Sequence, residues 1–127
     1  MNKAVQTITL IVFLAGTLSC EKYEPKTYQE LRDRMHTTYV GKQTGDGTQS
    51  FFDEEVQFLP MDDSSSMVIG RFYDSLIVNV TDVDYSNGHV FFSGDSISYL
   101  SYLDEDESLL VIKELSIFYM YTGKRKK

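Results

Sequence analysis

Few side chains in this sequence are of the types that carry out catalysis or bind metal ions. The 127 residues include one cysteine, Cys20, and two histidines, His36 and His89. A zinc site brings together about four cysteine, histidine or carboxylate ligands. Neither histidine has a second histidine or a cysteine near it in the sequence. We therefore expect no metal site and no cofactor.

The segment "GDSIS" (94–98) follows an apolar pair, Phe91-Phe92, and resembles the nucleophile block of GDSL-type hydrolases. The resemblance implies that Ser96 is a nucleophile, which would need a general base to take its proton. That family places its aspartate and histidine near the C-terminus, whereas this chain has no histidine after His89. We interpret the segment as a hairpin turn and predict that the protein is not an enzyme. An enzyme would need the fold to bring a histidine beside an acid and a nucleophile in a cleft.

Two acidic segments contain oxygen ligands of the kind that bind calcium. In "DVDYSNG" (82–88), Asn87 and Gly88 fall one place later than the EF-hand spacing requires. Both residues tolerate positive φ, so we predict a type I′ hairpin turn there. "DEDE" (104–107) is interpreted as a second charged turn. Two such loops at one end of a barrel would hold a cation only loosely.

Residues 1–19 have the layout of a secretory signal peptide, in which Lys3 precedes a mostly apolar stretch and small residues precede Cys20. A membrane-spanning helix needs roughly 20 apolar residues. This stretch is shorter and charged residues follow it at once, which makes a retained signal anchor the less favoured alternative.

The segment around Cys20 resembles a bacterial lipoprotein signal with its lipobox. The resemblance implies that Cys20 becomes the first mature residue and carries the lipid. Ser19 fits the small residue before it, whereas Thr17 stands where a large aliphatic residue is usual. Ordinary cleavage after Ser19, which would leave a free cysteine, is the alternative. We expect residues 20–26 to form a tether that anchors the protein in the outer membrane of a cell envelope, on its periplasmic or surface face.

The mature part of the chain is strongly acidic. All 19 acidic residues and 11 of the 12 basic residues follow residue 19, so the net charge there is 11 − 19 = −8. Because such a domain repels phosphate backbones, we expect no nucleic-acid partner. The basic residues 124–127 are interpreted as a frayed, solvated tail, with contact to anionic lipid head groups as the alternative.

One short helix is predicted before a mainly-β domain. Thr27 and Glu30 have the spacing of a capping box, and apolar residues recur at helical spacing from Tyr28 to about His36. After the helix, alternation with a period of two predicts strands. They are expected at about 37–43, 50–59, 67–69, 76–83, 89–92, 97–103 and 109–122.

Two strands have specific expected faces. In 50–59, we expect Phe52, Val56 and Phe58 to share one face. The last and longest strand, 109–122, is expected to place six apolar residues on one face: Leu109, Val111, Leu115, Ile117, Tyr119 and Tyr121. These patterns predict a single domain, residues 27–123, built as an antiparallel meander of about seven strands in a small barrel or sandwich.

Aromatic residues concentrate in the last part of the domain, at Tyr99, Tyr102, Phe118, Tyr119 and Tyr121. We expect them to fill the core and form cross-strand pairs. The alternative is functional: Tyr99, Tyr102, Tyr119 and Tyr121 would line the mouth of the barrel, stack on a small ligand and offer hydroxyl groups to it.

The opening of the β domain, "TYVGKQTGDGT" (38–48), has a Tyr-x-Gly-Lys first strand formed by Tyr39, Gly41 and Lys42. Together with the lipoprotein-like N-terminus and the charged tether, it resembles small lipoproteins of gut Bacteroidota with a calycin-like, that is lipocalin-like, β-barrel. The resemblance implies a fold and a compartment, but no chemistry. We expect a membrane-anchored, non-enzymatic binding module for a small ligand, or alternatively an accessory subunit that binds another envelope protein.

Overall fold

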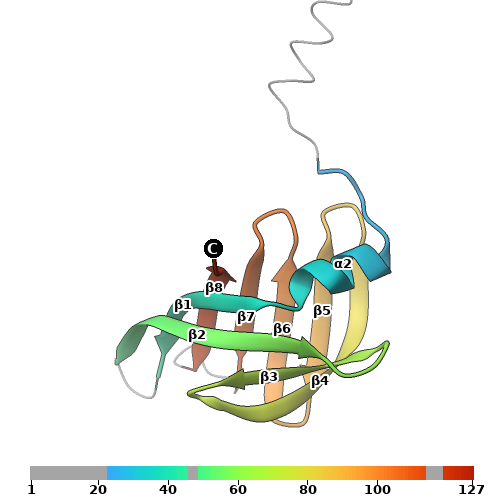
Figure 1. Cartoon of the computed structure of the whole chain (residues 1–127). Helices are drawn as coiled ribbons and strands as arrows, with labels where there is room; N and C mark the ends of the chain where they lie inside the picture. The colour runs from blue at the N-terminus through green and yellow to red at the C-terminus, as the bar shows by residue number, and fades with distance from the viewer. Residues whose placement is uncertain (1–22, 46–48, 114–118) are drawn as a thin grey trace, which may run out of the picture.

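Eight antiparallel strands close into one barrel, and a short helix precedes them (Figure 1). The computed structural model describes residues 23–45, 49–113 and 119–127. The elements are α2 (Tyr28–Met35), β1 (Thr38–Thr44), β2 (Ser50–Pro60), β3 (Ser65–Gly70), β4 (Tyr73–Asp84), β5 (His89–Gly94), β6 (Ile97–Leu103), β7 (Ser108–Ile112) and β8 (Met120–Arg125).

The predicted signal segment, 1–19, and Cys20 lie outside the described residues. Within the described part of the chain, no helix has the length and apolar character that crossing a membrane requires.

The helix begins where its capping box predicts. The Thr27 side chain accepts a hydrogen bond from the Glu30 backbone N–H (3.2 Å), and the Glu30 carboxylate accepts one from the Thr27 N–H (3.1 Å). These bonds satisfy backbone donors that the first turn leaves free. Leu31 and Met35, four residues apart on one face, are both fully buried in the core. The helix thus lies over the barrel end that carries the β4–β5 and β6–β7 loops (Figure 1).

Each strand pairs with its neighbour in sequence, and β1 also pairs with β8 to close the barrel. This confirms the mainly-β, antiparallel barrel, but with eight strands in place of about seven. The difference arises in the segment 109–122, which was expected to form one strand. It instead includes most of β7 and the start of β8, and these two strands pair with each other. Alternation continues through the segment without a glycine or proline, so no local signal marks the reversal. Leu115, Ile117 and Phe118 lie outside the described residues.

The C-terminal residues belong to the barrel, which corrects the expectation of a frayed tail over 124–127. β8 continues to Arg125, and Lys124 and Arg125 pair with Val40 and Tyr39 of β1. The Lys126 N–H then donates to the Thr38 carbonyl at 2.9 Å. These basic residues can form part of the closing strand because the backbone N–H and C=O groups of β1 need hydrogen-bond partners, whatever side chains the partner strand carries.

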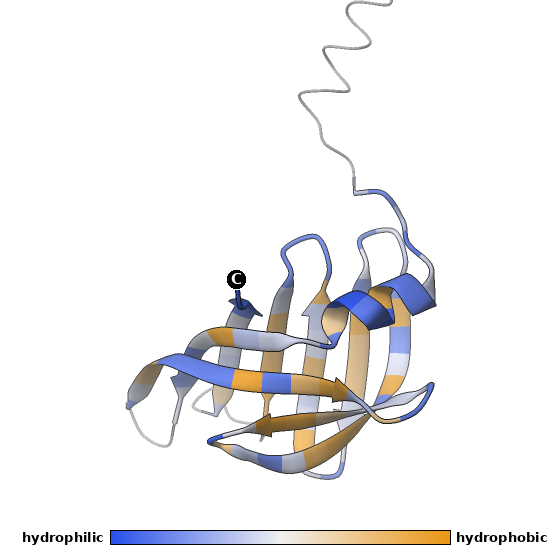
Figure 2. Ribbon diagram, viewed as in Figure 1, coloured by the Kyte–Doolittle hydropathy of each residue, from blue (hydrophilic) through white to orange (hydrophobic). Residues whose placement is uncertain are grey.

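Large side chains fill the inside of the barrel. Six buried aromatic residues are no more than 2% exposed: Tyr39, Phe58, Tyr73, Phe92, Tyr102 and Tyr121. Three pairs of them meet nearly edge to face: Tyr39–Tyr102, Phe58–Phe92 and Tyr73–Tyr121, with ring centroids 6.4, 5.2 and 6.5 Å apart. Figure 2 shows hydrophobic positions recurring along the strands that enclose this core.

One residue on β2 faces the opposite side from the one expected. Val56 and Phe58 point into the core, but Phe52 is 69% exposed and Phe51 packs against Phe72. Asp53 has a φ of 57°, and the register with β1 shifts at this point. The bulge adds one residue to the strand, and the alternation before it is therefore reversed.

The β4–β5 connection is a four-residue loop, which corrects the predicted type I′ turn. Asp84 pairs with His89, so residues 85–88 form the loop. Only Gly88 among them has a positive φ, 68°. The Asp84 carboxylate accepts hydrogen bonds from the Ser86 N–H (3.0 Å) and hydroxyl (2.6 Å). This side-chain turn stabilises the longer loop.

Candidate functional site

The structure does not bring the four candidate tyrosines together at one mouth. Tyr102 and Tyr121 point into the core, where their hydroxyls donate to the Asp104 carboxylate (2.6 Å) and the Glu54 carbonyl (3.0 Å). Tyr99 lies on the outside of the barrel, with its ring 6.1 Å from that of Phe91.

Tyr119 is half-buried, with the Lys113 ammonium 5.8 Å from its ring centroid. The four tyrosines therefore lie in different environments. Two of them, Tyr102 and Tyr121, donate hydrogen bonds from within the core.

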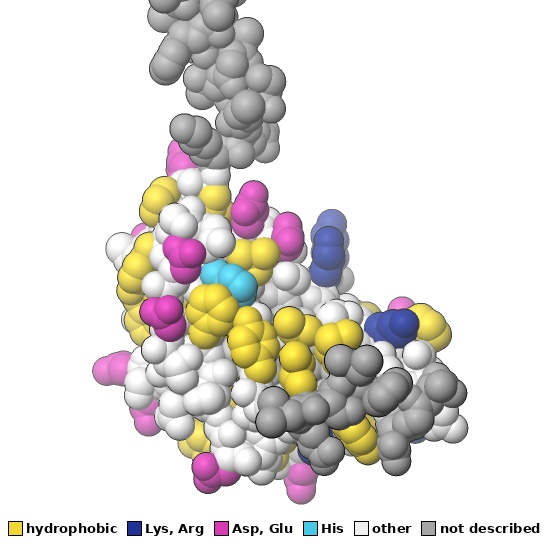
Figure 3. Space-filling model, turned by 180° about the vertical axis from the view of Figure 1, so that it is seen from behind, with side chains coloured by type: hydrophobic (Ala, Val, Ile, Leu, Met, Phe, Trp, Pro, Cys, Tyr) yellow, Lys and Arg dark blue, Asp and Glu magenta, His cyan; other side chains and the backbone are white. Residues whose placement is uncertain are grey.

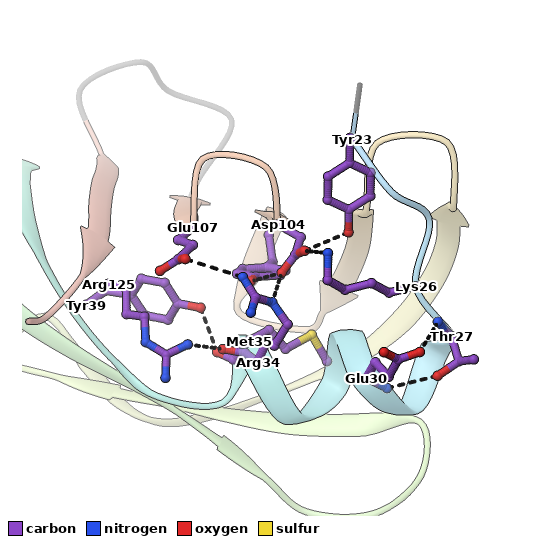
Figure 4. Close-up of polar contacts among 11 residues, drawn as sticks. Tyr23, Lys26, Thr27, Glu30, Arg34, Met35, Tyr39, Asp104, Glu107 and Arg125 are labelled. Carbon is purple, nitrogen blue, oxygen red and sulfur yellow. Dashed lines mark hydrogen bonds and ion pairs between the residues drawn. The ribbon is translucent and has the colours of Figure 1, made fainter. Parts of the chain in front are cut away.

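The principal polar cluster lies at the helix end of the barrel and is centred on Asp104 (Figure 4). Its carboxylate accepts hydrogen bonds from the Tyr23 and Tyr102 hydroxyls, both at 2.6 Å. It also pairs with Arg34 Nε at 2.7 Å and Lys26 Nζ at 3.1 Å. The Asp104 side chain is fully buried. Four donors from three separate segments thus converge on one buried carboxylate.

These contacts determine the charge state of Asp104. Burial alone would raise the pKa of this carboxyl group, but the hydrogen bonds from Tyr102, Tyr23, Arg34 and Lys26 outweigh burial and hold the pKa well below its usual range. Burial and the bond to Asp104 raise the pKa of both tyrosine hydroxyls. The cluster therefore consists of an ionised acid, two cations and two neutral phenols.

The acidic β6–β7 turn is consequently not an open cation site. Its one buried carboxylate already binds Lys26 and Arg34, and Arg34 also contacts Glu107 at 3.3 Å. Among the described residues, no group of three histidine, cysteine or acidic side chains is placed to hold a metal ion. The turn instead fastens the segment before α2 to the barrel.

Sequence reasoning missed the role of Asp104 because it treated "DEDE" as a solvated turn. A signal was present, since Leu100, Tyr102 and Asp104 stand two residues apart, and Leu100 and Tyr102 face the core. Continuing the strand alternation by one step would have directed Asp104 inward.

The fold places His36 beside a hydroxyl, at 2.7 Å from its Nε2 to Ser66 Oγ. The imidazole also packs on Phe58, with ring centroids 5.2 Å apart. A nucleophilic serine must reach its substrate, but Ser66 is only 2% exposed. In the part of the chain that the structure describes, no carboxylate hydrogen-bonds to His36. We therefore interpret the contact between His36 and the buried Ser66 as a structural hydrogen bond.

Burial lowers the pKa of His36 from 6.5 to about 4, with a further contribution from the charge of Arg32. Unfolding allows the imidazole to bind a proton at pH values where the folded state does not. We therefore expect His36 to contribute stability fully above pH 6.5 and to lose that contribution as the pH falls towards 4. Denaturant unfolding at pH 7 and pH 5 should show a smaller pH dependence for His36→Gln. Equal pH dependence of the two proteins would contradict this assignment.

The "GDSIS" segment forms the predicted hairpin turn between β5 and β6, where Gly94 pairs with Ile97. Ser96 borders an open surface depression that Lys113 also lines. His89 lies on the outer face of β5, with its ring 4.1 Å from that of Phe91. The described part of this depression thus includes no histidine that would activate the serine.

Comparison with protein-family models, curated proteins and solved structures gave no match to this chain.

Proposed function

We propose that this protein is a non-enzymatic module, held at the cell envelope by a lipid on Cys20, that binds another envelope protein through the outside of its barrel. The filled interior of the barrel is the observation that supports binding on its outer surface. An eight-stranded barrel is just wide enough to be filled by side chains or to hold one small ligand. Here six buried aromatic rings occupy the inside. This favours a partner on the outer surface over a ligand within.

The closed sheet also restricts how a partner would bind. Because β1 pairs with β8, each of the eight described strands lies between two others, which restricts the addition of an extended segment to the sheet. Recognition would therefore depend on outward-facing side chains.

The proposed anchor would hold the helix end of the barrel close to the membrane. Tyr23 and Lys26, within the expected tether, are bound to Asp104. Only Glu21 and Lys22 lie between Cys20 and Tyr23, which are thus three residues apart. Three residues span about 10 Å when fully extended. The barrel would thus stand at the membrane surface with its helix end towards the lipid.

The proposed partner can be sought by chemical cross-linking in intact envelopes, followed by purification and mass analysis. We expect a defined adduct with a second protein that survives stringent washing. Recovery of the monomer alone would argue against an accessory role.

Replacing Cys20 with alanine tests the anchor directly. We expect most of the protein to move from the membrane pellet to the soluble fraction, because the acyl chains would supply the membrane affinity. Membrane fractionation and immunoblotting measure this change. Thr17→Leu is the matched control, since it places a large aliphatic residue at the variant position of the lipobox-like segment and should retain the protein in the pellet. If the Cys20→Ala protein sediments as completely as the wild type, lipidation does not hold it there.

A further inference from the structure

Five large hydrophobic side chains are exposed in the described part of the chain, and three of them belong to neighbouring positions around β2, β3 and β4. These are Leu59, Met61 and Ile77, which are 36%, 47% and 48% exposed. Leu59 pairs with Met67 of β3, and Met67 pairs with Ile77 of β4. Side chains directly opposite each other on neighbouring strands have Cβ atoms about 5 Å apart. Leu59, Met67 and Ile77 thus form a continuous apolar row, which we call the β2–β4 ladder.

The ladder lies on the outside of the barrel. Phe58, Val68 and Val78, each next in sequence to one member of the ladder, are fully buried, so strand alternation directs the ladder outward. Neighbouring strands lie about 4.8 Å apart, and the three strands of the ladder therefore span only about 10 Å. Exposed apolar side chains that adjoin one another on one face, unlike scattered ones, indicate a binding surface.

A polar hollow adjoins the β4 end of the ladder. Its volume is about 370 Å³. Residues of β4 and of the β5–β6 turn line it, among them Ser75, Ile77, Asn79, Asp95 and Ser96. The turn can lie against β4 because Gly94 has no side chain, and a Cβ atom there would overlap the backbone oxygen of Ile77. The hollow and the ladder therefore share Ile77 and form one surface.

The chemistry of the hollow suits a cationic side chain. Asp95 is exposed and is the charged residue of its described lining. Within residues 23–45, 49–113 and 119–127, no lysine or arginine forms an ion pair with Asp95. Serine hydroxyls and the Asn79 side chain supply neutral hydrogen-bond acceptors around it. A lysine or arginine from a partner would thus find a carboxylate and several further acceptors in the hollow.

The charges around the ladder are also predominantly acidic. Asp62-Asp63 in the β2–β3 loop and Asp74 in β4 are exposed. Of the cations in this region, Arg71 pairs with Glu54 at 3.1 Å, and Arg32 donates to the Asp62 backbone carbonyl. The whole chain has a net charge of −7. A basic partner is therefore attracted to this surface, and an acidic one is repelled.

Figure 3 shows a second group of hydrophobic side chains on the back of the molecule, beside a histidine. Acidic side chains lie at its left and lysine or arginine side chains at its right, so its charges favour neither a basic nor an acidic partner. The acidic surroundings of the ladder, by contrast, specify the sign of the partner's charge.

We propose that the β2–β4 ladder and the adjoining hollow bind a basic segment of the partner protein. Apolar side chains of that segment would cover the ladder, and a lysine or arginine side chain would enter the hollow beside Asp95. This inference rests on the proposed function, because it gives the position and the chemistry of the contact with the second envelope protein. The apolar contact supplies affinity, while the ion pair selects a basic segment.

A photoreactive benzophenone side chain in place of Ile77 tests the position of the site. Irradiation of intact envelopes should join the whole protein to one partner. Mass analysis should locate the cross-link in a segment with lysine or arginine beside apolar residues. The matched control places the same side chain at Thr122, an exposed β-branched residue of β8. Because β8 is four strands from β4 in either direction around the barrel, this control should give no such adduct.

Asp95→Asn tests the ion pair, because it keeps the shape of the side chain and removes its charge. We expect the yield of the Ile77 adduct to fall about fivefold. Asp106→Asn, at an exposed acid of the β6–β7 turn, should leave that yield unchanged. Far-UV circular dichroism of the purified variants checks that each one folds. An unchanged yield in Asp95→Asn would overturn the role given to the hollow.

The remaining outcomes separate this site from the proposed function. Cross-links from position 77 to an acidic segment, to a second copy of this chain or to lipid alone would overturn the proposed site. A partner captured from position 122 but not from position 77, or only by a general cross-linker, would overturn the site and leave the proposed function standing. Absence of any second protein in all of these experiments would overturn both.

Discussion

Replacing Asp104 with alanine is expected to lower the free energy of unfolding by about 3 kcal/mol. The substitution removes the shared acceptor of Tyr23, Tyr102, Lys26 and Arg34, whose donor atoms lie 2.6–3.1 Å from its carboxylate. The Tyr102 hydroxyl would then be buried without a partner, which carries a desolvation penalty.

The expected effect lies at the lower end of the range for breaking a buried ion pair. The side chains of Arg34 and Lys26 are 39% and 24% exposed, so both cations can still reach water when the acid is removed. Urea unfolding of wild type and variant, followed by circular dichroism, would measure the difference.

Asp106→Ala is the matched control, because Asp106 is an exposed acid in the same turn. Its effect should stay within about 0.5 kcal/mol. A similar small effect of Asp104→Ala would contradict the view that this carboxylate fastens the N-terminal segment.

Acid should remove the stabilisation that Asp104 provides. Because the pKa of its carboxyl group is lower in the folded state than its ordinary value of 3.8, the stabilisation is present above that pH. It should be lost as the pH falls below 3.8 through the lower folded-state pKa. We therefore expect the free energies of unfolding of wild type and Asp104→Ala to converge in strong acid.

Replacing Gly41 with alanine is expected to cost about 3 kcal/mol, since it would force apart the seam that closes the barrel. Gly41 pairs with Gly123 across the β1–β8 junction. A Cβ atom at Gly41 would overlap the backbone oxygen of Thr122 and the Cα atom of Gly123. Backbone atoms cannot rotate away as a side chain can, so the two strands would have to separate.

Gly45→Ala provides the control for the loss of a glycine in the same region. Its added Cβ would lie 3.5 Å from the Phe51 side chain, an ordinary contact distance. We expect a change below about 1 kcal/mol in urea unfolding. Hydrogen exchange should also show faster opening of β1 and β8 in Gly41→Ala but not in Gly45→Ala. Equal behaviour of the two variants would mean that the seam tolerates a side chain.

Local patterns predicted much of the fold because their physical causes act over a few residues. Thr27 and Glu30 bind each other's backbone within one turn, so their spacing sufficed to place the start of the helix. The apolar and aromatic run "ISYLSYL" (97–103), bounded by turn signals on both sides, was sufficient to predict β6. The Gly94-Asp95 turn signal likewise predicted the hairpin between β5 and β6.

The candidate site was predicted less well, because its contacts join distant parts of the chain. All three are tyrosines in strand-like sequence, and nothing local distinguishes Tyr102 and Tyr121 from Tyr99. Yet the first two donate hydrogen bonds in the core, and the third lies on the outer surface. The bulge at Asp53, which adds one residue to β2, reversed the expected face of Phe52.

By itself, the sequence determined the helix, the β character of the domain and most turn positions, since each of these depends on neighbouring residues. Only the tertiary structure decided that the basic C-terminal residues complete the barrel beside β1 and that Asp104 is buried. The Tyr23–Asp104 hydrogen bond joins residues 81 positions apart. Such features depend on closing the barrel, and no local spacing encodes that closure.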